Sequence, residues 1–205
     1  MKERGILFTP PNHRLIRDGI KIQTRRVMKT QIENLCFAGF EGTGYQPLRM
    51  DGEPIGCPYG QLGDRLYVKE GVIIHADGET LAGYYMDGVR VTNLGEKRLT
   101  AMFMAKRHAR TWLDLIDVRV ERLQDISEDD AIAEGIIGEN VIVGANCNGG
   151  IHHEEMAMRY FFDGGYDEGY ESAVEAYEHL WDSINKKTHP WKNNDRVWVL
   201  TFKKL

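Results

Sequence analysis

The chain has 205 residues, enough for one large domain or for a small domain with long insertions. Its formal net charge of −5 argues against a general nucleic-acid coat protein, although a local basic patch is compatible with this charge. No apolar run approaches the roughly 20 residues of a membrane-spanning helix, and the charged N-terminus does not resemble a secretion signal. We therefore expect no membrane partner.

The three cysteines, Cys36, Cys57 and Cys147, are an odd number at wide spacing. A disulfide framework is not expected, and a reducing cytoplasm is the expected compartment. Cys147 lies near His152 and His153, but two adjacent histidines rarely form a closed zinc site. We therefore expect neither a metal nor a cofactor.

The N-terminal region predicts a strand followed by a short helix. The apolar residues 6–8 stop at Pro10, which is consistent with a first strand. Asn12 is a suitable N-cap for a helix that buries Ile16 and ends at Gly19. Glycine suits such an end because it enters the left-handed backbone region without strain.

The stretch from residue 19 to residue 26 combines β-branched residues with three cations. In an extended strand residues 21, 23 and 25 share one face, but a bend or bulge could bring Lys21 and Thr24 to one pocket. A lysine beside a threonine hydroxyl can produce an activated nucleophile. Most Lys-x-x-Thr spacings are a solvated cation and a strand threonine, so the spacing alone leaves both interpretations open.

The next segments predict a long loop and a strand. Residues 30–62 carry glycine and proline at short intervals, and loops of this length are often functional or mobile. Residues 65–74 predict a strand with Leu66, Val68 and Val72 on its core face. Glu70 shares that face, so it lies either at the end of the strand or in a polar cavity. It is a candidate substrate-binding residue.

Residues 106–110 form the densest basic cluster of the chain, with Arg107 at its centre. This pattern is typical of a solvated strand end, and it also suits a surface for a phosphate or a nucleoside. The following residues, 112–122, predict a strand in which Ile116 and Val118 face the core. Leu113 and Leu115 have the opposite parity, and a β-bulge would restore a single apolar face.

Residues 127–135 predict a short helix that begins at the N-cap Ser127 and ends at Gly135. Glu134 is unusual because it places a carboxylate at the negative end of the helix dipole. An exposed carboxylate there is disfavoured by about 0.3–1 kcal/mol. This position suits a general acid or base, and it also suits a solvent-facing glutamate that tolerates a small penalty.

The C-terminal part predicts a Gly-rich insertion over residues 138–170, with a short helical patch at residues 154–162. An amphipathic helix over residues 171–185 follows, and its apolar face comprises Val174, Tyr177, Leu180, Trp181 and Ile184. Residues 196–203 are apolar on both faces, which is typical of a central strand. The sum predicts an α+β fold, mostly β, in which residues 1–205 form one small barrel with insertions at about 30–62 and 138–170.

Several segments, taken in order, resemble one family. They are Gly19-x-Lys21-x-x-Thr24-x-Arg26, residues 63–70, residues 118–135, residues 181–185 and residues 198–202. Together they are similar to ASCH domains of the PUA-like barrel superfamily, and in particular to the long ASCH proteins of phages and prophages. The resemblance covers nearly the whole chain. It implies a PUA-like barrel with a cleft suited to a nucleobase or RNA.

The resemblance also implies a chemistry. A small bacterial ASCH enzyme hydrolyses N4-acetylcytidine to cytidine and acetate with a lysine, a threonine and a glutamate. These match Lys21, Thr24 and Glu134 here, the last lying seven residues beyond the cap position Ser127. By this resemblance Thr24 would be the nucleophile and Lys21 its base, and Glu134 would give a proton to the departing amino group and orient water for the second step.

The sequence thus supports an amidohydrolase acting on an acylated cytosine nucleoside. Arg26, with Arg25, would bind an oxyanion or a sugar oxygen, and Glu70 and Arg107 would contribute to substrate binding. A PUA-like module that only binds RNA is the alternative, through Lys21, Arg25, Arg26, Lys106, Arg107 and Arg110. An ASCH-type ribonuclease is the third hypothesis.

Overall fold

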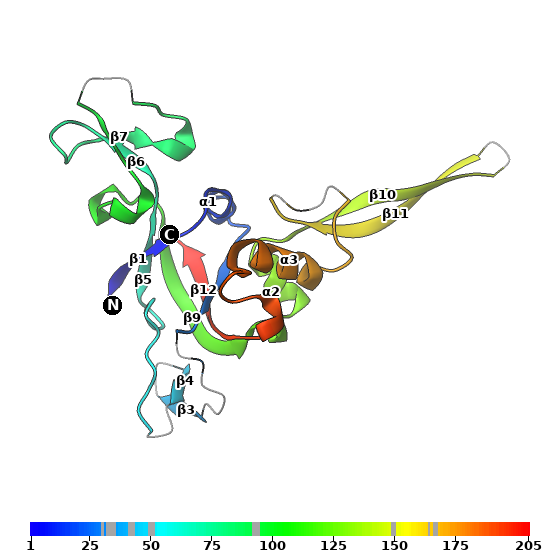
Figure 1. The fold of residues 1–205 in the computed structure, drawn as a ribbon, viewed down its shortest axis with the longest axis horizontal. Helices are drawn as coiled ribbons and strands as arrows, with labels where there is room; N and C mark the ends of the chain where they lie inside the picture. Colours follow the sequence, from blue (N-terminus) through cyan, green and yellow to red (C-terminus); the bar gives the residue numbers. More distant parts are fainter. Residues whose placement is uncertain are drawn as a thin grey trace. The chain divides into compact units, whose positions relative to one another are not determined.

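The computed structural model describes residues 1–29, 31, 36–40, 44–48, 52–91, 95–148, 151–163, 165 and 168–205 (Figure 1). Within these residues the fold is mixed α+β and consists mostly of strands, together with three α-helices, as the α+β prediction expected. Residue contacts divide the chain into two compact units. Unit 1 comprises Met1–Ile22, Asn34–Arg119 and Leu200–Leu205, and unit 2 comprises Gln23–Glu33 and Val120–Val199.

The largest sheet has five strands in the order β1-β5-β9-β12-β2. The strands are β1 (Glu3–Leu7), β2 (Gln23–Val27), β5 (Arg65–Lys69), β9 (Trp112–Arg122) and β12 (Arg196–Lys204). β1 pairs with β5 in parallel, and β5 pairs with the first residues of β9 antiparallel. β12 lies between two other strands and is buried from residue 197 to residue 200. The prediction of a central strand from its apolar pattern is therefore confirmed.

Helix α1 (Pro10–Arg17) begins earlier than its sequence predicted. Its N-cap is Thr9, so Asn12 lies inside the helix and its prediction as the N-cap is wrong. Proline is favoured in a first helical turn, because the N–H that it lacks would have no partner there. Gly19 has φ +77°, which confirms the predicted helix end at a glycine.

The predicted strand at residues 65–74 is two strands, because β5 ends at Lys69 and β6 (Val72–Ile74) begins after Gly71. A Cβ atom at Gly71 would lie 2.5 Å from the ring of Tyr85, so this close approach requires glycine. β6 pairs on either side with β7 (Leu81–Tyr84) and β8 (Lys97–Leu99). The expected core residues Leu66, Val68 and Val72 are all buried.

Two expectations in unit 1 are wrong. The stretch at residues 30–62 is not simply a loop, because β3 (Cys36–Phe40) and β4 (Gly44–Leu48) form an antiparallel hairpin within it. Its dense glycines mask the strand-forming residues Phe37 and Tyr45. In β9, Leu113 and Leu115 supply the buried face, whereas Ile116 is 52% exposed. Side chains alternate along the strand without the expected slip, so Ile116 lies on the other face.

Unit 2 has its own apolar core around helices α2 (Glu128–Ala133) and α3 (Ala173–Asn185). The buried members of this core include Leu123, Ile136, Tyr177, Trp181 and Val199. Of the residues expected on the apolar face of α3, Val174 and Leu180 pack against this core, but Ile184 is 57% exposed. The predicted helix is confirmed, and only its last apolar residue is misplaced.

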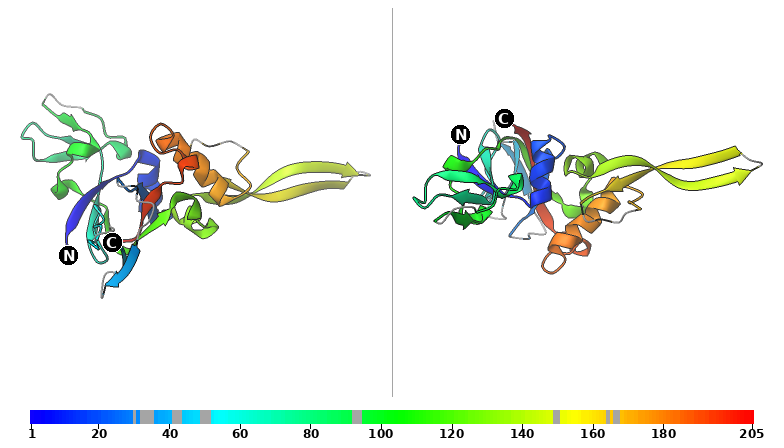
Figure 2. Two further views of the ribbon diagram at one scale, coloured as in Figure 1. Left: turned by 60° about the horizontal axis from the view of Figure 1, so that its bottom comes forward. Right: turned by 90° about the horizontal axis from the view of Figure 1, so that it is seen from above.

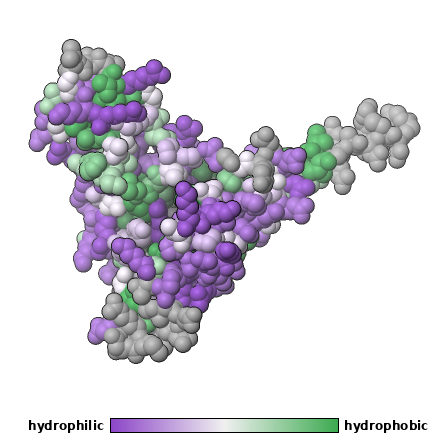
Figure 3. Space-filling model, viewed as in Figure 1, coloured by the Kyte–Doolittle hydropathy of each residue, from purple (hydrophilic) through white to green (hydrophobic). Residues whose placement is uncertain are grey.

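Strands β10 (Ile137–Asn148) and β11 (Ile151–Phe161) form a long antiparallel ribbon in unit 2, which Figure 2 shows in two views. The helical patch predicted at residues 154–162 is wrong, because residues 154–161 belong to β11. Glu154, Glu155 and Ala157 favour helices when isolated, but cross-strand pairing overrides that propensity. Figure 3 shows apolar surface on the ribbon, and the exposed large apolar residues described there include Ile137, Ile142, Val143, Met156 and Met158.

Ser127 stabilises the start of α2, as predicted, by accepting a hydrogen bond from the Asp130 backbone N–H at 3.1 Å. We expect Ser127→Ala to lower the free energy of unfolding by about 1 kcal/mol, because it leaves a helix N–H without its cap. Urea denaturation would measure this loss. The control Ser183→Ala removes an exposed hydroxyl within α3 and should stay within about 0.5 kcal/mol of wild type. Equal effects of the two substitutions would contradict the prediction.

Among the described residues, no helix is long and apolar enough to cross a membrane.

Candidate functional site

Eight polar or charged residues are buried in the part of the chain that the structure describes. They are Lys21, Gln23, Thr24, Arg25, Asp64, Glu70, His108 and Glu134. Burying a charged group is costly unless it is paired, so such residues mark either a structural network or a functional site. Five of the eight had been selected from the sequence as catalytic or substrate-binding candidates.

Glu134 is held at the end of α2 by a well-formed C-terminal cap. Gly135 adopts φ +104° and donates its N–H to the carbonyl of Ile132 at 2.8 Å. Ile136 donates to the carbonyl of Ala131 at 3.3 Å, and its side chain is buried. This pair of bonds is the Schellman arrangement, which fixes the direction of the chain after the helix. The Glu134 side chain is consequently buried and only 4% exposed.

Two residues of unit 2 contact the Glu134 carboxylate. The Arg25 guanidinium lies 3.5 Å from Oε1, and the Tyr177 hydroxyl donates to the same oxygen at 3.4 Å. The Arg25 guanidinium also lies over the Tyr177 ring, 5.9 Å from its centroid. Burial, followed by the negative charge of Glu134, raises the pKa of Tyr177 well above its usual range. Among its partners the carboxylate therefore has a cation, Arg25, and a protonated phenol, Tyr177.

Arg25 is the centre of this cluster, and its side chain has no exposed surface. Its other partners are Gln23 Oε1 at 2.5 Å, Asp130 Oδ2 at 2.8 Å and Glu121 Oε2 at 3.1 Å. Burial alone would lower the pKa of Arg25, but Glu134 and Asp130 raise it overall. The guanidinium is thus permanently charged and oriented by residues of its own unit.

The proposed nucleophile Thr24 lies in β2, beside Arg25, and is 5% exposed. Gln23, Thr24 and Arg25 are buried in succession, so both faces of this strand are covered. Lys21, the proposed base, belongs to unit 1 and is 3% exposed; its backbone N–H donates to the Leu15 carbonyl at 3.1 Å. Both residues are therefore shielded from solvent rather than displayed as a solvated cation and a surface threonine.

The basic cluster is a short 3₁₀ helix, Lys106–His108, rather than a strand end. Arg107 is exposed, and Lys106 forms an ion pair with Glu3. Arg110 pairs with Glu70 and Asp87, and Arg26 in β2 is half-buried. Several of the cations expected to hold RNA are therefore buried or paired with carboxylates.

Glu70 follows the last residue of β5 and lines a polar pocket, so the two interpretations of this glutamate both hold. Arg110 binds its carboxylate in a bidentate manner, with Nε 3.0 Å from Oε1 and Nη2 2.7 Å from Oε2. The same guanidinium holds Asp87 at 2.6 Å and lies 3.8 Å from the centroid of Tyr84. Hydrogen bonding to Glu70 raises the pKa of Arg110. Glu70 is therefore fixed in place.

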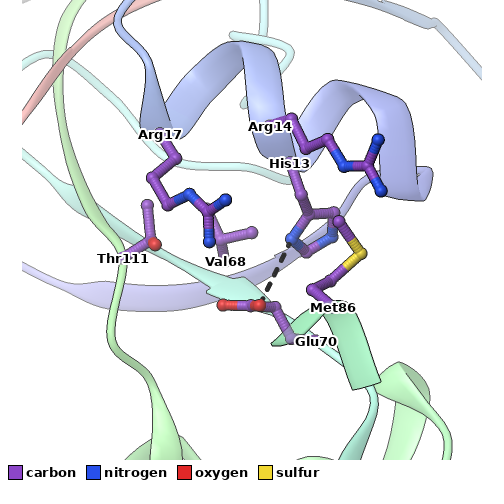
Figure 4. A pocket seen from close by; sticks show the side chains of 7 residues that line it. All are labelled: His13, Arg14, Arg17, Val68, Glu70, Met86 and Thr111. Carbon is purple, nitrogen blue, oxygen red and sulfur yellow. Dashed lines mark ion pairs between the residues drawn. The ribbon is translucent and has the colours of Figure 1, made fainter. Parts of the chain in front are cut away.

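The pocket around Glu70 belongs to unit 1 and has a volume of about 240 Å³, part of which is open to solvent (Figure 4). Helix α1 contributes His13, Arg14 and Arg17 to it, and the other lining residues are Val68, Glu70, Met86 and Thr111. His13 Nδ1 lies 4.0 Å from Glu70 Oε2, and its Nε2 lies 3.2 Å from the Phe8 carbonyl oxygen.

His13 should make the stability of the protein depend on pH. Burial lowers its pKa below the usual 6.5, against the opposing effects of Glu70 and the Phe8 carbonyl. Between the lowered pKa and 6.5, the unfolded chain binds more protons than the folded one. The free energy of unfolding should therefore fall as pH drops below 6.5, and His13→Gln should make this fall shallower. Urea denaturation between about pH 5 and 8 measures it. A wild-type slope in His13→Gln would contradict the prediction.

Other chemistries receive little support from the described residues. Burial raises the pKa of the Cys57 thiol to about 11, so this thiol is a poor nucleophile at neutral pH. No group of three or more His, Cys, Asp or Glu in the described part could hold a metal ion. The side chains of Cys147, His152 and His153, on which the question of a zinc site rests, lie outside that part.

Three functional neighbours were not anticipated as such. Tyr177 was expected only as an apolar residue of α3, yet its hydroxyl reaches Glu134. Asp130 lies in the first turn of α2, where its backbone N–H donates to Ser127, and its side chain also binds Arg25. His13 was not among the candidate residues selected from the sequence. A tyrosine on the buried face of a helix signals that its hydroxyl needs a partner, and this signal could have identified Tyr177.

Comparisons with protein-family models, with curated proteins and with solved structures find no match to this chain.

Proposed function

We propose that this chain is an ASCH-type amidohydrolase with a PUA-like barrel, and that it hydrolyses N4-acetylcytidine or a related acylated nucleoside. One observation carries the proposal. The three residues that the resemblance selects, Lys21, Thr24 and Glu134, are all among the eight buried polar residues of the described chain. Lysine, threonine and glutamate are mostly exposed in proteins, so three ordinary surface residues of these types would not be expected to be buried together.

In the first step, the Thr24 hydroxyl oxygen attacks the acyl carbonyl carbon, and its proton passes to Lys21. Lys21 is 3% exposed, so it would accept this proton away from bulk solvent. The carbon–nitrogen bond then breaks, and the Lys21 ammonium returns the proton to the departing amino group. The products of this step are the free nucleoside and an acyl ester on Thr24.

In the second step, water attacks the ester and Glu134 accepts its proton. Arg25 lies 3.5 Å from this carboxylate and would hold it in position. The proton then passes to the Thr24 oxygen as the acid is released. This assignment differs from the sequence-based expectation that Glu134 protonates the leaving amine. Arg25 becomes a positioning residue, since its partners lie within unit 2, whereas Arg26 and Arg107 remain proposed substrate contacts.

The test is turnover of a panel of acylated nucleosides, N4-acetylcytidine first, with liquid chromatography of the nucleoside product and enzymatic detection of acetate. We expect stoichiometric formation of cytidine and acetate that saturates with substrate and changes little with salt. No turnover of any member of the panel would overturn the proposal. RNA binding that weakens steeply with salt, without turnover, would instead favour the RNA-binding module, and RNA cleavage would favour the ribonuclease.

A further inference from the structure

The pocket in unit 1 holds two hydrogen-bond acceptors that face each other without a donor between them. The Phe8 carbonyl can only accept a hydrogen bond, so the proton of His13 lies on Nε2 and leaves Nδ1 as an acceptor. Nδ1 lies 4.0 Å from Glu70 Oε2, which is too far for a direct hydrogen bond. Both side chains are at least nine-tenths buried, at 9% and 4% exposure.

The position of Glu70 is fixed by residues outside the pocket. Arg110 donates one hydrogen bond to each carboxylate oxygen and is itself held by Asp87. Each oxygen retains a further lone pair for a second donor. A ligand would therefore meet a preorganised acceptor and would not have to order it on binding.

The edge of the pocket is cationic. Arg14 and Arg17 line it, and Arg17 is 48% exposed, with only a loose contact of 3.6 Å to Asp87. With Arg110, which pairs with Glu70 and Asp87, three arginines are set against two carboxylates, which leaves one positive charge. The pocket thus presents acceptors at its floor and an uncompensated cation at its edge (Figure 4).

The size of the pocket restricts the ligand. The empty space of about 240 Å³ includes open solvent, so a ligand would be only partly enclosed. Val68 and Met86 supply apolar wall, and Thr111 adds a hydroxyl. These dimensions suit a compact ligand with a donor group at one end, an anionic group at the other and a short apolar part.

We propose that this pocket binds a free α-amino acid. The ammonium group lies between His13 Nδ1 and Glu70, the carboxylate pairs with Arg17, and a short side chain contacts Val68 and Met86. This binding is separate from the proposed hydrolase chemistry and does not depend on it.

The test is titration of the full chain with L-alanine, observed by NMR through the backbone amide signals of Glu70 and Thr111. Two matched probes carry half of the ligand each: n-propylamine supplies the amine and propionate the carboxylate. We expect L-alanine to bind with a dissociation constant on the order of 1 mM, at least about tenfold more tightly than either half.

The variants separate the two ends of the ligand. Arg17→Gln should weaken the binding of L-alanine and of propionate by about tenfold and leave the binding of n-propylamine unchanged. Glu70→Gln should weaken the binding of L-alanine and of n-propylamine. The control Arg65→Gln removes an arginine of the same unit that pairs with Asp114. It should leave the dissociation constants of all three ligands unchanged.

Three outcomes would overturn the proposal: shifts that do not saturate with L-alanine, equal binding of L-alanine and its halves, or unchanged binding in Arg17→Gln. Arg17 is half-exposed, so that variant keeps the test valid even if Glu70→Gln fails to fold.

Discussion

Replacing Arg25 by methionine is expected to lower the free energy of unfolding by about 3–5 kcal/mol. The substitution keeps the long apolar stem but removes the cation that Glu134 and Asp130 face. Glu134 is almost fully buried, so its charge would lose its partner without gaining water. Urea denaturation followed by circular dichroism would measure the change.

Two comparisons make this prediction specific. Arg65→Met removes an ion pair with Asp114 whose side chains are about one-third exposed, so we expect a loss of at most about 1 kcal/mol. The double substitution Arg25→Met with Glu134→Gln should recover part of the stability, because no uncompensated charge then remains at Glu134. A change below about 1 kcal/mol in Arg25→Met would show that the cluster does not stabilise unit 2.

Thr24→Ala is expected to reduce hydrolysis of N4-acetylcytidine by at least about 10³-fold, because it removes the attacking oxygen. Lys21→Met should have an effect of similar size, since it removes the proton acceptor while nearly preserving side-chain volume. Thr24→Ser retains a hydroxyl and should keep measurable activity. Initial rates over a range of substrate concentrations would show a loss in kcat rather than only a change in KM.

The controls for these variants are exposed residues of the same types. Thr188→Ala and Lys192→Met alter exposed side chains near the end of α3 and should leave kcat unchanged. The circular dichroism spectra of all variants should match that of wild type. Full activity in Thr24→Ala would exclude threonine as the nucleophile, even if the chain hydrolyses the substrate by another route.

The sequence predicted α2 well because its signals are local. Ser127 and Gly135 are the residues that an N-cap and a left-handed C-terminal cap require, and the structure uses both in that way. Glu134 was identified for the same reason, since its place is set by the helix end. Glu70 was noticed because a carboxylate interrupted an apolar strand face. A residue that breaks the local sequence pattern in this way often marks a functional or strained site.

The surroundings of these residues could not be predicted, because they depend on contacts between distant segments. Arg25 meets Asp130 and Tyr177 across more than 100 residues of sequence, and no local pattern specifies that pairing. The ribbon β10–β11 was missed for a related reason. Glu154 and Ala157 favour helix locally, and only pairing with the other strand makes them part of a sheet.

The β10–β11 ribbon is built as a ladder of paired residues, and among the described residues only Tyr160 of its two strands packs against the core of unit 2. The outermost residue pairs of the ribbon can therefore be gained or lost in evolution without changes in that core. Because removing the outermost pair shifts no other pair, every remaining side chain keeps its own face. Relatives of this chain should accordingly differ in the length of the ribbon, while the cap that holds Glu134 stays constant.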